Sequence, residues 1–158
     1  MRLSVRPGLG VLLAAFLAGC QGEPLAVGSV TLRLDVQPRQ VAPDDSFTVR
    51  LVVRNIGASD TTLQSGCSVP TFFALEGSAG TIHPAPGYGC LTVITNYKIA
   101  AHDSLTFTRR FVAHDTALDG YPAVPPGAYA VVTEWQIWGL PVLREALMVT
   151  GPQVVPTP

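Results

Sequence analysis

The chain has 158 residues, of which 47% are hydrophobic and 13% charged, and its formal net charge at pH 7 is −1. This length is enough for one domain after removal of a short leader. The 10 basic and 11 acidic side chains form no basic stripe or cluster along the sequence, which argues against nucleic-acid binding and against electrostatic docking to a membrane.

Residues 1–19 have the pattern of a secretory leader. Arg2 and Arg6 supply a positive start, and an apolar stretch follows from Leu9 to Ala18. This stretch is shorter than the ~20 residues that a helix needs to cross a bilayer. The ending "LAGC" resembles the bacterial lipobox, which implies cleavage before Cys20 and attachment of lipid to its thiol.

The lipobox resemblance also implies a location. Gln21 and Gly22 follow Cys20, in place of the aspartate that favours retention at the inner membrane. We therefore expect lipid anchoring at the outer membrane, facing the periplasm, if the host has two membranes. We expect the lipidated tether at residues 20–28, the folded domain at 29–150 and a flexible proline-rich tail at 151–158.

Alternation with a period of two begins after the tether and predicts half-buried β-strands. In "VTLRLDV", every second residue from Val30 to Val36 is apolar, and "FTVRLVVRN" continues the pattern from Phe47. The turn-forming stretch "APDD" lies between them. Asp44 and Asp45 are therefore expected to shape this turn, and a pair of catalytic carboxylates is the less favoured alternative.

Shorter strand candidates follow. "TTLQ" and "VPTFFALEG" precede an irregular stretch around "GTIHPAPGYGCLTV". In "SLTFTRRFVA", Arg109 falls on the apolar side, so either a bulge intervenes or the strand has reached a rim. "VPPGAYAVVTEWQIW" points Tyr129 and Trp135 inward, and "VLREALMVT" is the last strand. Seven to nine short strands predict an all-β antiparallel β-sandwich.

The two cysteines that remain after Cys20 are Cys67 and Cys90. An exported chain meets an oxidising compartment, so we expect these two to form a disulfide. The alternative, a reactive thiol pair, would require a C-x-x-C spacing or basic neighbours, and the sequence has neither.

Residues suited to catalysis or metal binding are few. His83, His102 and His114 lie beside turn or loop residues, and the pairs "HD" at 102–103 and 114–115 are typical of solvated turns. The sequence contains no hydrolase, zinc, phosphate-loop or calcium-loop motif. We therefore expect no catalytic residue, metal or cofactor, and a protein that is not an enzyme.

Three segments carry a family resemblance. They are "FTVRLVVRNIGASDTTLQSGCSVPTFFALEG", "IAAHDSLTFTRRF" and "VPPGAYAVV", which together span roughly residues 45 to 135. In order and spacing they resemble the intracellular proteinase inhibitor domain of bacilli (the BsuPI type). The sequence departs from that pattern where "AAHDS" lacks a Pro-Gly turn and where Phe111 replaces a tryptophan. The resemblance implies an Ig-like sandwich and inhibition of a proteinase.

Together these features predict a membrane-anchored envelope lipoprotein whose Ig-like domain binds protein without catalysis. The alternative is a structural or assembly accessory without a discrete ligand. Binding residues of such sandwiches concentrate on loops. The candidates here are Tyr88 in "HPAPGYG" and Trp138 in "WQIWGLP". Both rings could instead cover the open ends of the sandwich.

Overall fold

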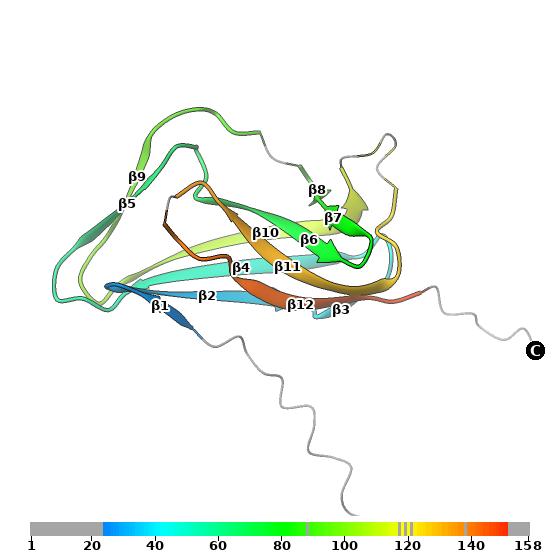
Figure 1. Cartoon of the computed structure of the whole chain (residues 1–158), viewed down its shortest axis with the longest axis horizontal. Helices are drawn as coiled ribbons and strands as arrows, with labels where there is room; N and C mark the ends of the chain where they lie inside the picture. The colour runs from blue at the N-terminus through cyan, green and yellow to red at the C-terminus, as the bar shows by residue number, and fades with distance from the viewer. Residues whose placement is uncertain are drawn as a thin grey trace, which may run out of the picture.

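The alternating segments of the sequence form strands in the computed structural model. It describes residues 24–87, 89–116, 118, 120, 122–137 and 139–151. Cys20, Tyr88 and Trp138 lie outside the described residues, as does the expected tail from residue 152 onward. The described part is an Ig-like antiparallel β-sandwich, with two sheets packed face to face (Figure 1).

Each of the two sheets has five strands. In order across the sheet, sheet A contains β1 (Leu25–Val27), β2 (Val30–Gln37), β4 (Ser46–Asn55), β10 (Ser104–Asp115) and β8 (Pro84–Ala85). Sheet B contains β3 (Gln40–Val41), β12 (Arg144–Val149), β11 (Gly127–Trp135), β6 (Thr71–Gly77) and β7 (Gly80–Ile82). A separate two-stranded ribbon pairs β5 (Thr61–Ser65) with β9 (Thr95–Ile99) and extends from one end of the sandwich (Figure 1). Neighbouring strands are antiparallel except β3 and β12.

The predicted alternation is confirmed in the core. The apolar positions of β2 and β4 are buried, and they are Val30, Leu32, Leu34, Val36, Phe47, Val49, Leu51 and Val53. Three rings join the sheets at one end of this core. Phe111 of β10 stacks on Phe47 of β4 at 5.6 Å between centroids and meets the edge of Phe73 of β6 at 5.9 Å. Aromatic contacts of this kind add to the burial of apolar area.

The segment "VPPGAYAVV" forms the start of β11 and places Tyr129 against the core. The Tyr129 hydroxyl donates to the Pro125 carbonyl oxygen at 2.8 Å. This is the tyrosine corner that Ig-fold domains use to hold a strand start. The ring lies directly over Gly77, where an added Cβ would come within 2.6 Å of it. Glycine at position 77 thus makes room for the ring.

The number of longer strands agrees with the seven to nine strands expected from the sequence. Eight of the strands in the described part have five or more residues, and the other four, β1, β3, β7 and β8, have two or three. The structure differs from the expected boundaries at the N-terminus. β1 pairs with β2 inside the segment expected as tether, so sheet A begins at Leu25.

Several local expectations have clear outcomes. Asp44 and Asp45 lie in a turn, where Asp44 has a φ of 68° and the Asp45 carboxylate accepts the Ala42 N–H at 3.3 Å. Trp135 packs against the core and donates its Nε1–H to a backbone carbonyl oxygen. Arg109 pairs with Val49 in unbroken register, so the rim, and not a bulge, explains its place on the apolar side.

Candidate functional site

One side of the sandwich is only partly closed. β7 pairs with the end of β6, from Leu75 onward, and β8 pairs with β10 from Val112 onward. The chain passes from one sheet to the other between these two short strands, at His83. Because β7 and β8 have three and two residues, the earlier parts of β6 and β10 have a neighbouring strand on one side only among the described residues. A groove lies along this open side.

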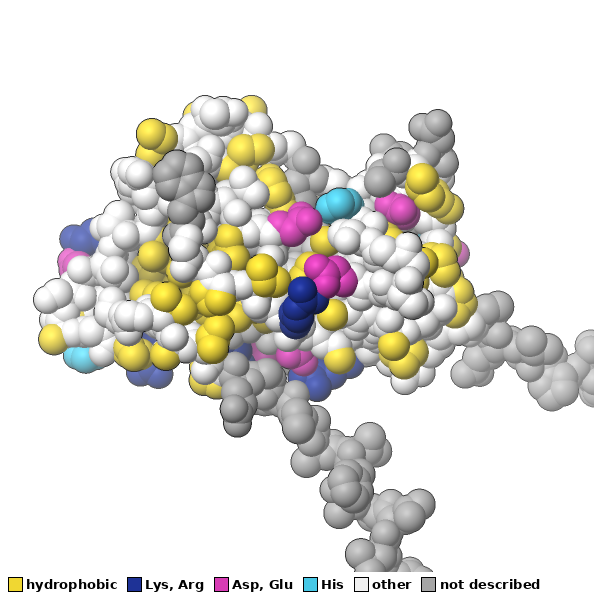
Figure 2. All heavy atoms as spheres, in the orientation of Figure 1, with side chains coloured by type: hydrophobic (Ala, Val, Ile, Leu, Met, Phe, Trp, Pro, Cys, Tyr) yellow, Lys and Arg dark blue, Asp and Glu magenta, His cyan; other side chains and the backbone are white. Residues whose placement is uncertain are grey.

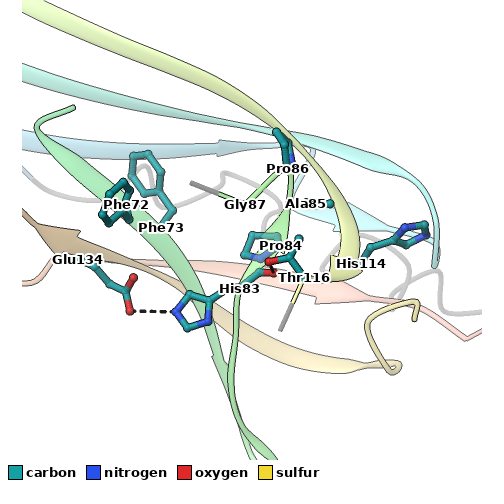
Figure 3. A pocket seen from close by; sticks show the side chains of 10 residues that line it. All are labelled: Phe72, Phe73, His83, Pro84, Ala85, Pro86, Gly87, His114, Thr116 and Glu134. Carbon is teal, nitrogen blue, oxygen red and sulfur yellow. Dashed lines mark hydrogen bonds and ion pairs between the residues drawn. The ribbon is translucent and has the colours of Figure 1, made fainter. Parts of the chain in front are cut away.

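The larger part of the groove has a volume of about 860 Å³ (Figure 3). Residues of β6, β7–β8, β10 and β11 line it, and they are Phe72, Phe73, His83, Pro84, Ala85, Pro86, Gly87, His114, Thr116 and Glu134. Phenylalanine and proline side chains make most of this lining apolar, while polar groups stand at the margins. Sites that bind other molecules commonly combine an apolar surface with a few polar groups in this way.

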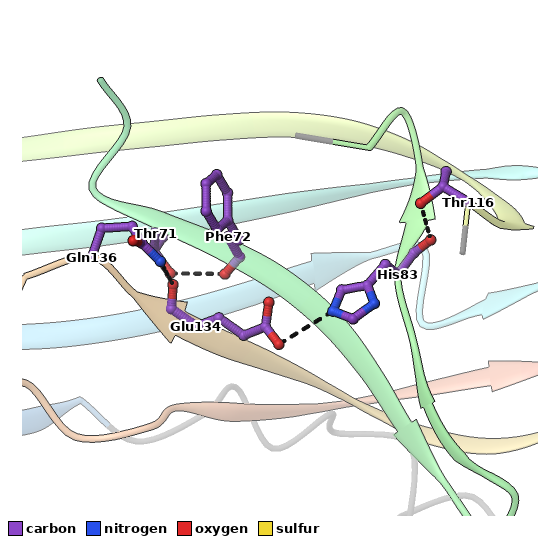
Figure 4. Close-up of polar contacts among 6 residues, drawn as sticks. All are labelled: Thr71, Phe72, His83, Thr116, Glu134 and Gln136. Atoms are coloured by element: carbon purple, nitrogen blue, oxygen red, sulfur yellow. Dashed lines mark hydrogen bonds and ion pairs between the residues drawn. The ribbon is translucent and has the colours of Figure 1, made fainter. Parts of the chain in front are cut away.

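His83 is held at its backbone by Thr116 and at its ring by Glu134 (Figure 4). The backbone N–H and the Oγ1–H of Thr116 both donate to the His83 carbonyl oxygen, each at 2.9 Å. The His83 Nε2 lies 3.4 Å from the Glu134 Oε1 on β11. Both side chains stay accessible, with 47% of His83 and 39% of Glu134 exposed. The pair therefore forms a polar margin that can still exchange partners.

A smaller pocket of about 270 Å³ continues the groove beyond Phe73, which lines both parts. One wall is the segment 69–71, and the other is residues 106–109 of β10. Tyr97 of the ribbon lies across the end of this wall and meets the edge of Phe107 at 5.4 Å between centroids. The open side thus offers one elongated groove between the two sheets.

Among the described residues of the groove, no nucleophile lies against the imidazole of His83. His83 contacts Glu134, but the hydroxyl of Thr116 is engaged with a carbonyl oxygen and does not meet the imidazole. Nucleophilic catalysis requires a base within hydrogen-bonding reach of the nucleophile. Glu134 is the one carboxylate among the described residues that line the larger pocket. Within the described part, no cluster of three or more histidine, cysteine or acidic residues could hold a metal ion.

The expected disulfide is present. Cys67 and Cys90 are bonded, with their Cα atoms 5.5 Å apart. The bond joins the loop after β5 to the loop before β9, and the Ser68 N–H also donates to the Leu91 carbonyl oxygen. Beside it, Leu91 and Ile94 are 71% and 73% exposed. A constrained loop therefore carries apolar side chains into solvent.

The predicted binding and histidine residues have different outcomes. Tyr88 and Trp138 lie outside the described residues, and their roles stay predictions. Pro86 and Gly87 of the predicted loop "HPAPGYG" do line the groove. For His114, the aspartate in contact is not its neighbour in sequence but Asp44, which lies in the turn before β4. His102 is exposed in a turn with a φ of 63°.

The sequence did not predict the groove itself. Its lining residues Phe72, Thr116 and Glu134 belong to separate strands or turns and show no shared motif.

The sequence also did not predict a group of arginines on the outer face of sheet A. In the strand register, Arg110 lies beside Thr48, two positions from Arg50, and Arg54 continues the same face of β4. The spacing of Arg50 and Arg54 could have indicated a shared side, but Arg110 joins them only through pairing.

Charge is therefore unevenly distributed. On the opposite face, shown in Figure 2, acidic and histidine side chains gather at the upper edge over β6 and β8, whereas hydrophobic side chains spread towards the ribbon end. On the sheet A face, Arg50, Arg54 and Arg110 have no carboxylate within ion-pair distance among the described residues. Because the net charge of the chain is only −1, composition did not indicate this group of arginines.

The fold defines the chain as an Ig-like sandwich protein. Comparison with known proteins gives information on the fold and not on the function. Neither protein-family models nor curated proteins give a match. Among solved structures, a β-glucosidase from Erythrobacter marinus is 11% identical with a TM-score of 0.50, over 77% of this chain and 15% of that chain. The PapD-like domain 7 of human CEP192 is 12% identical with a TM-score of 0.32, over 92% of this chain and 98% of that domain.

The chain spans only 15% of the Erythrobacter enzyme, and the identity is low. That likeness concerns a sandwich-sized part of a much longer protein and says nothing of its activity here. In the described part of the chain, no helix has the length and apolar character needed to cross a membrane.

Proposed function

We propose that this protein is a membrane-anchored envelope lipoprotein whose Ig-like domain binds another protein without catalysis. The observation that carries this proposal is the elongated groove on the open side of the sandwich. It combines an apolar lining of aromatic and proline side chains with an accessible His83–Glu134 margin. In the part of the chain that the structure describes, no nucleophile is placed against the imidazole, which favours recognition over chemistry.

The position of the groove suits a protein partner. Leu25, the start of β1, follows Cys20 by only five positions in the sequence. A chain of that length reaches roughly 17 Å at most, so lipid on Cys20 would keep the β1 side near the membrane. β8, which lines the groove, lies in the upper part of Figure 1, whereas β1 lies at the lower edge. The mouth of the groove would therefore face away from the lipid and remain open to other proteins.

Proteinase inhibition is the specific form of binding that the BsuPI-type resemblance suggests. The feature that favours it is the loop held by Cys67 and Cys90, with Leu91 and Ile94 exposed beside the bond. A constrained extended loop loses less conformational entropy on binding than a free one. The rival proposal is a structural or assembly accessory of the envelope without a discrete ligand.

The anchor is tested by labelling with radioactive fatty acid. Label should enter the wild-type chain and be absent from Cys20→Ala. Equal labelling of both would refute lipidation at this cysteine and with it the proposed location.

Protein binding is tested by photo-crosslinking in cells that express the full chain. A photoreactive residue replaces Phe72 in the groove, and the matched control replaces exposed Ala146 on β12. A discrete protein adduct at position 72 that is absent at position 146 is expected. Adducts at neither position would favour the structural role. Purified adduct partners are then tested as proteinases with and without the protein, because inhibition predicts loss of their activity.

A further inference from the structure

The open side of the sandwich exposes part of the backbone of β10, and the hydrogen-bond register shows which of its groups point away from β4. Asn55 N–H donates to the Asp103 carbonyl oxygen at one end, and Ala113 N–H donates to the Asp45 carbonyl oxygen at the other. In an antiparallel pair, every second residue bonds to the same neighbour. The odd-numbered residues of β10 therefore bond to β4, and the even-numbered residues direct their N–H and C=O groups to the other side.

That other side has no strand along the first part of β10. β8 takes up the pairing only from Val112, so the edge-facing groups of Thr106, Thr108 and Arg110 and the C=O of Ser104 meet no strand within the described part of the chain. The Ser104 N–H donates to the Asp103 carboxylate at 2.7 Å. The segment spans seven residues, roughly 23 Å of extended chain. An edge of this kind is a template for one more strand.

Side chains around the edge define what such a strand would carry. Alternate residues of an added strand would point inward, towards the smaller pocket, where Val69, Phe73 and Phe107 supply apolar surface and Thr71 and Arg109 supply polar groups. Those positions suit apolar side chains. The remaining residues would point outward beside Thr106, Thr108 and Arg110. Arg50 on the next strand lies beside Asp35 of β2, so Arg110 is the cation nearest to the edge on this face. β10 itself carries no acidic residue from Ser104 to Ala113, so the positions beside Arg110 suit carboxylates.

We propose that the unpaired edge of β10 captures an extended, acidic segment of a partner protein by strand addition, with apolar residues alternating with aspartate or glutamate. The inference rests on the proposed protein-binding function and names the kind of segment that the groove accepts. Main-chain hydrogen bonds supply the affinity of such complexes, and the alternate side chains supply the selectivity.

The test uses the purified mature chain in detergent and a capped heptapeptide that alternates valine and glutamate. The peptide should bind and should slow amide hydrogen exchange, measured by NMR, at Thr106, Thr108 and Arg110. A matched peptide that alternates valine and lysine should bind about tenfold or more weakly. Binding of the acidic peptide without new protection at these alternate amides would overturn the proposal, as would no binding or equal binding of the two peptides.

Variants separate the backbone from the charge. Thr108→Pro removes an edge-facing N–H without removing a bond to β4, and it should weaken binding about tenfold or more. Its control, Thr108→Val, retains the N–H and should bind as the wild type does. Arg110→Glu should invert the preference between the two peptides, whereas Arg54→Glu, one strand further from the edge, should preserve it. If Thr108→Pro does not fold, the Arg110→Glu comparison and the exchange pattern still decide the question.

The two proposals fail separately. A crosslinked partner at position 72 together with no binding of the acidic peptide would reject strand addition and leave the protein-binding function standing. Peptide binding with the predicted exchange pattern, but without a crosslinked partner at position 72, would support strand addition at the edge of β10. It would reject a protein partner at the larger pocket.

Discussion

Asn55 is the side chain whose removal should disturb the ribbon end of the sandwich most. It is completely buried at the end of β4. Its Nδ2 donates to the carbonyl oxygens of Ser59 at 2.8 Å and of Ile99 and Ala100 at 3.2 Å each, and its Oδ1 accepts the Gly57 N–H at 2.9 Å. One amide thus ties the turn after β4 to the turn before β10.

The cost of Asn55→Ala follows from these contacts. The amide has two N–H groups for three carbonyl oxygens, so the two longer contacts share one hydrogen. Counting three effective bonds at about 1 kcal/mol each predicts a loss of about 3 kcal/mol in the free energy of unfolding. Asn55→Asp should cost at least as much, because a carboxylate cannot donate to the three carbonyl oxygens.

Urea unfolding followed by tryptophan fluorescence measures this loss. The control is Asn96→Ala on β9, where the side chain is exposed and accepts one bond from Gln64 at 3.3 Å. Its free energy of unfolding should change by less than about 0.5 kcal/mol. If Asn55→Ala were no more destabilising than Asn96→Ala, the hydrogen-bond reasoning for this turn would be wrong.

Three further predictions concern stability. Replacing Cys67 and Cys90 by alanine opens a loop with a sequence separation of 23 and should cost about 3 kcal/mol in urea unfolding; equal stability of the reduced and oxidised wild type would contradict this. Gly77→Ala places a methyl group against the Tyr129 ring and should cost about 1–3 kcal/mol, so an unchanged melting temperature would show that the ring moves freely. Burial raises the pKa of the Glu145 carboxyl despite its arginine neighbours. Because the native state then holds this proton more tightly than the unfolded state, its contribution to stability is fully present below the unfolded pKa and declines as pH rises through the higher native pKa. Glu145→Gln should remove that decline from unfolding curves measured across the carboxyl range, and identical pH profiles would refute it.

The sequence by itself determined which side of each main strand faces the core. Phe47 and Tyr129 are buried because apolar residues recur at every second position, and strand geometry alone carries that information. Turn chemistry placed Asp44 and Asp45 correctly, and the cysteine count left a single pairing once Cys20 was assigned to lipid. These inferences depend on neighbours in the chain or on composition, so they did not require the arrangement of the sheets.

The groove, its polar margin and the open edge depend on how distant segments pair in space. His83 and Glu134 are 51 positions apart, and they meet because β7 lies beside β6 and β6 beside β11. Arg110 joins Arg50 on one face through the pairing of β10 with β4. The edge of β10 is open because β8 is only two residues long. Alternation specifies the two faces of a strand, but which strands lie side by side, and where pairing stops, depends on hydrogen bonds between distant segments.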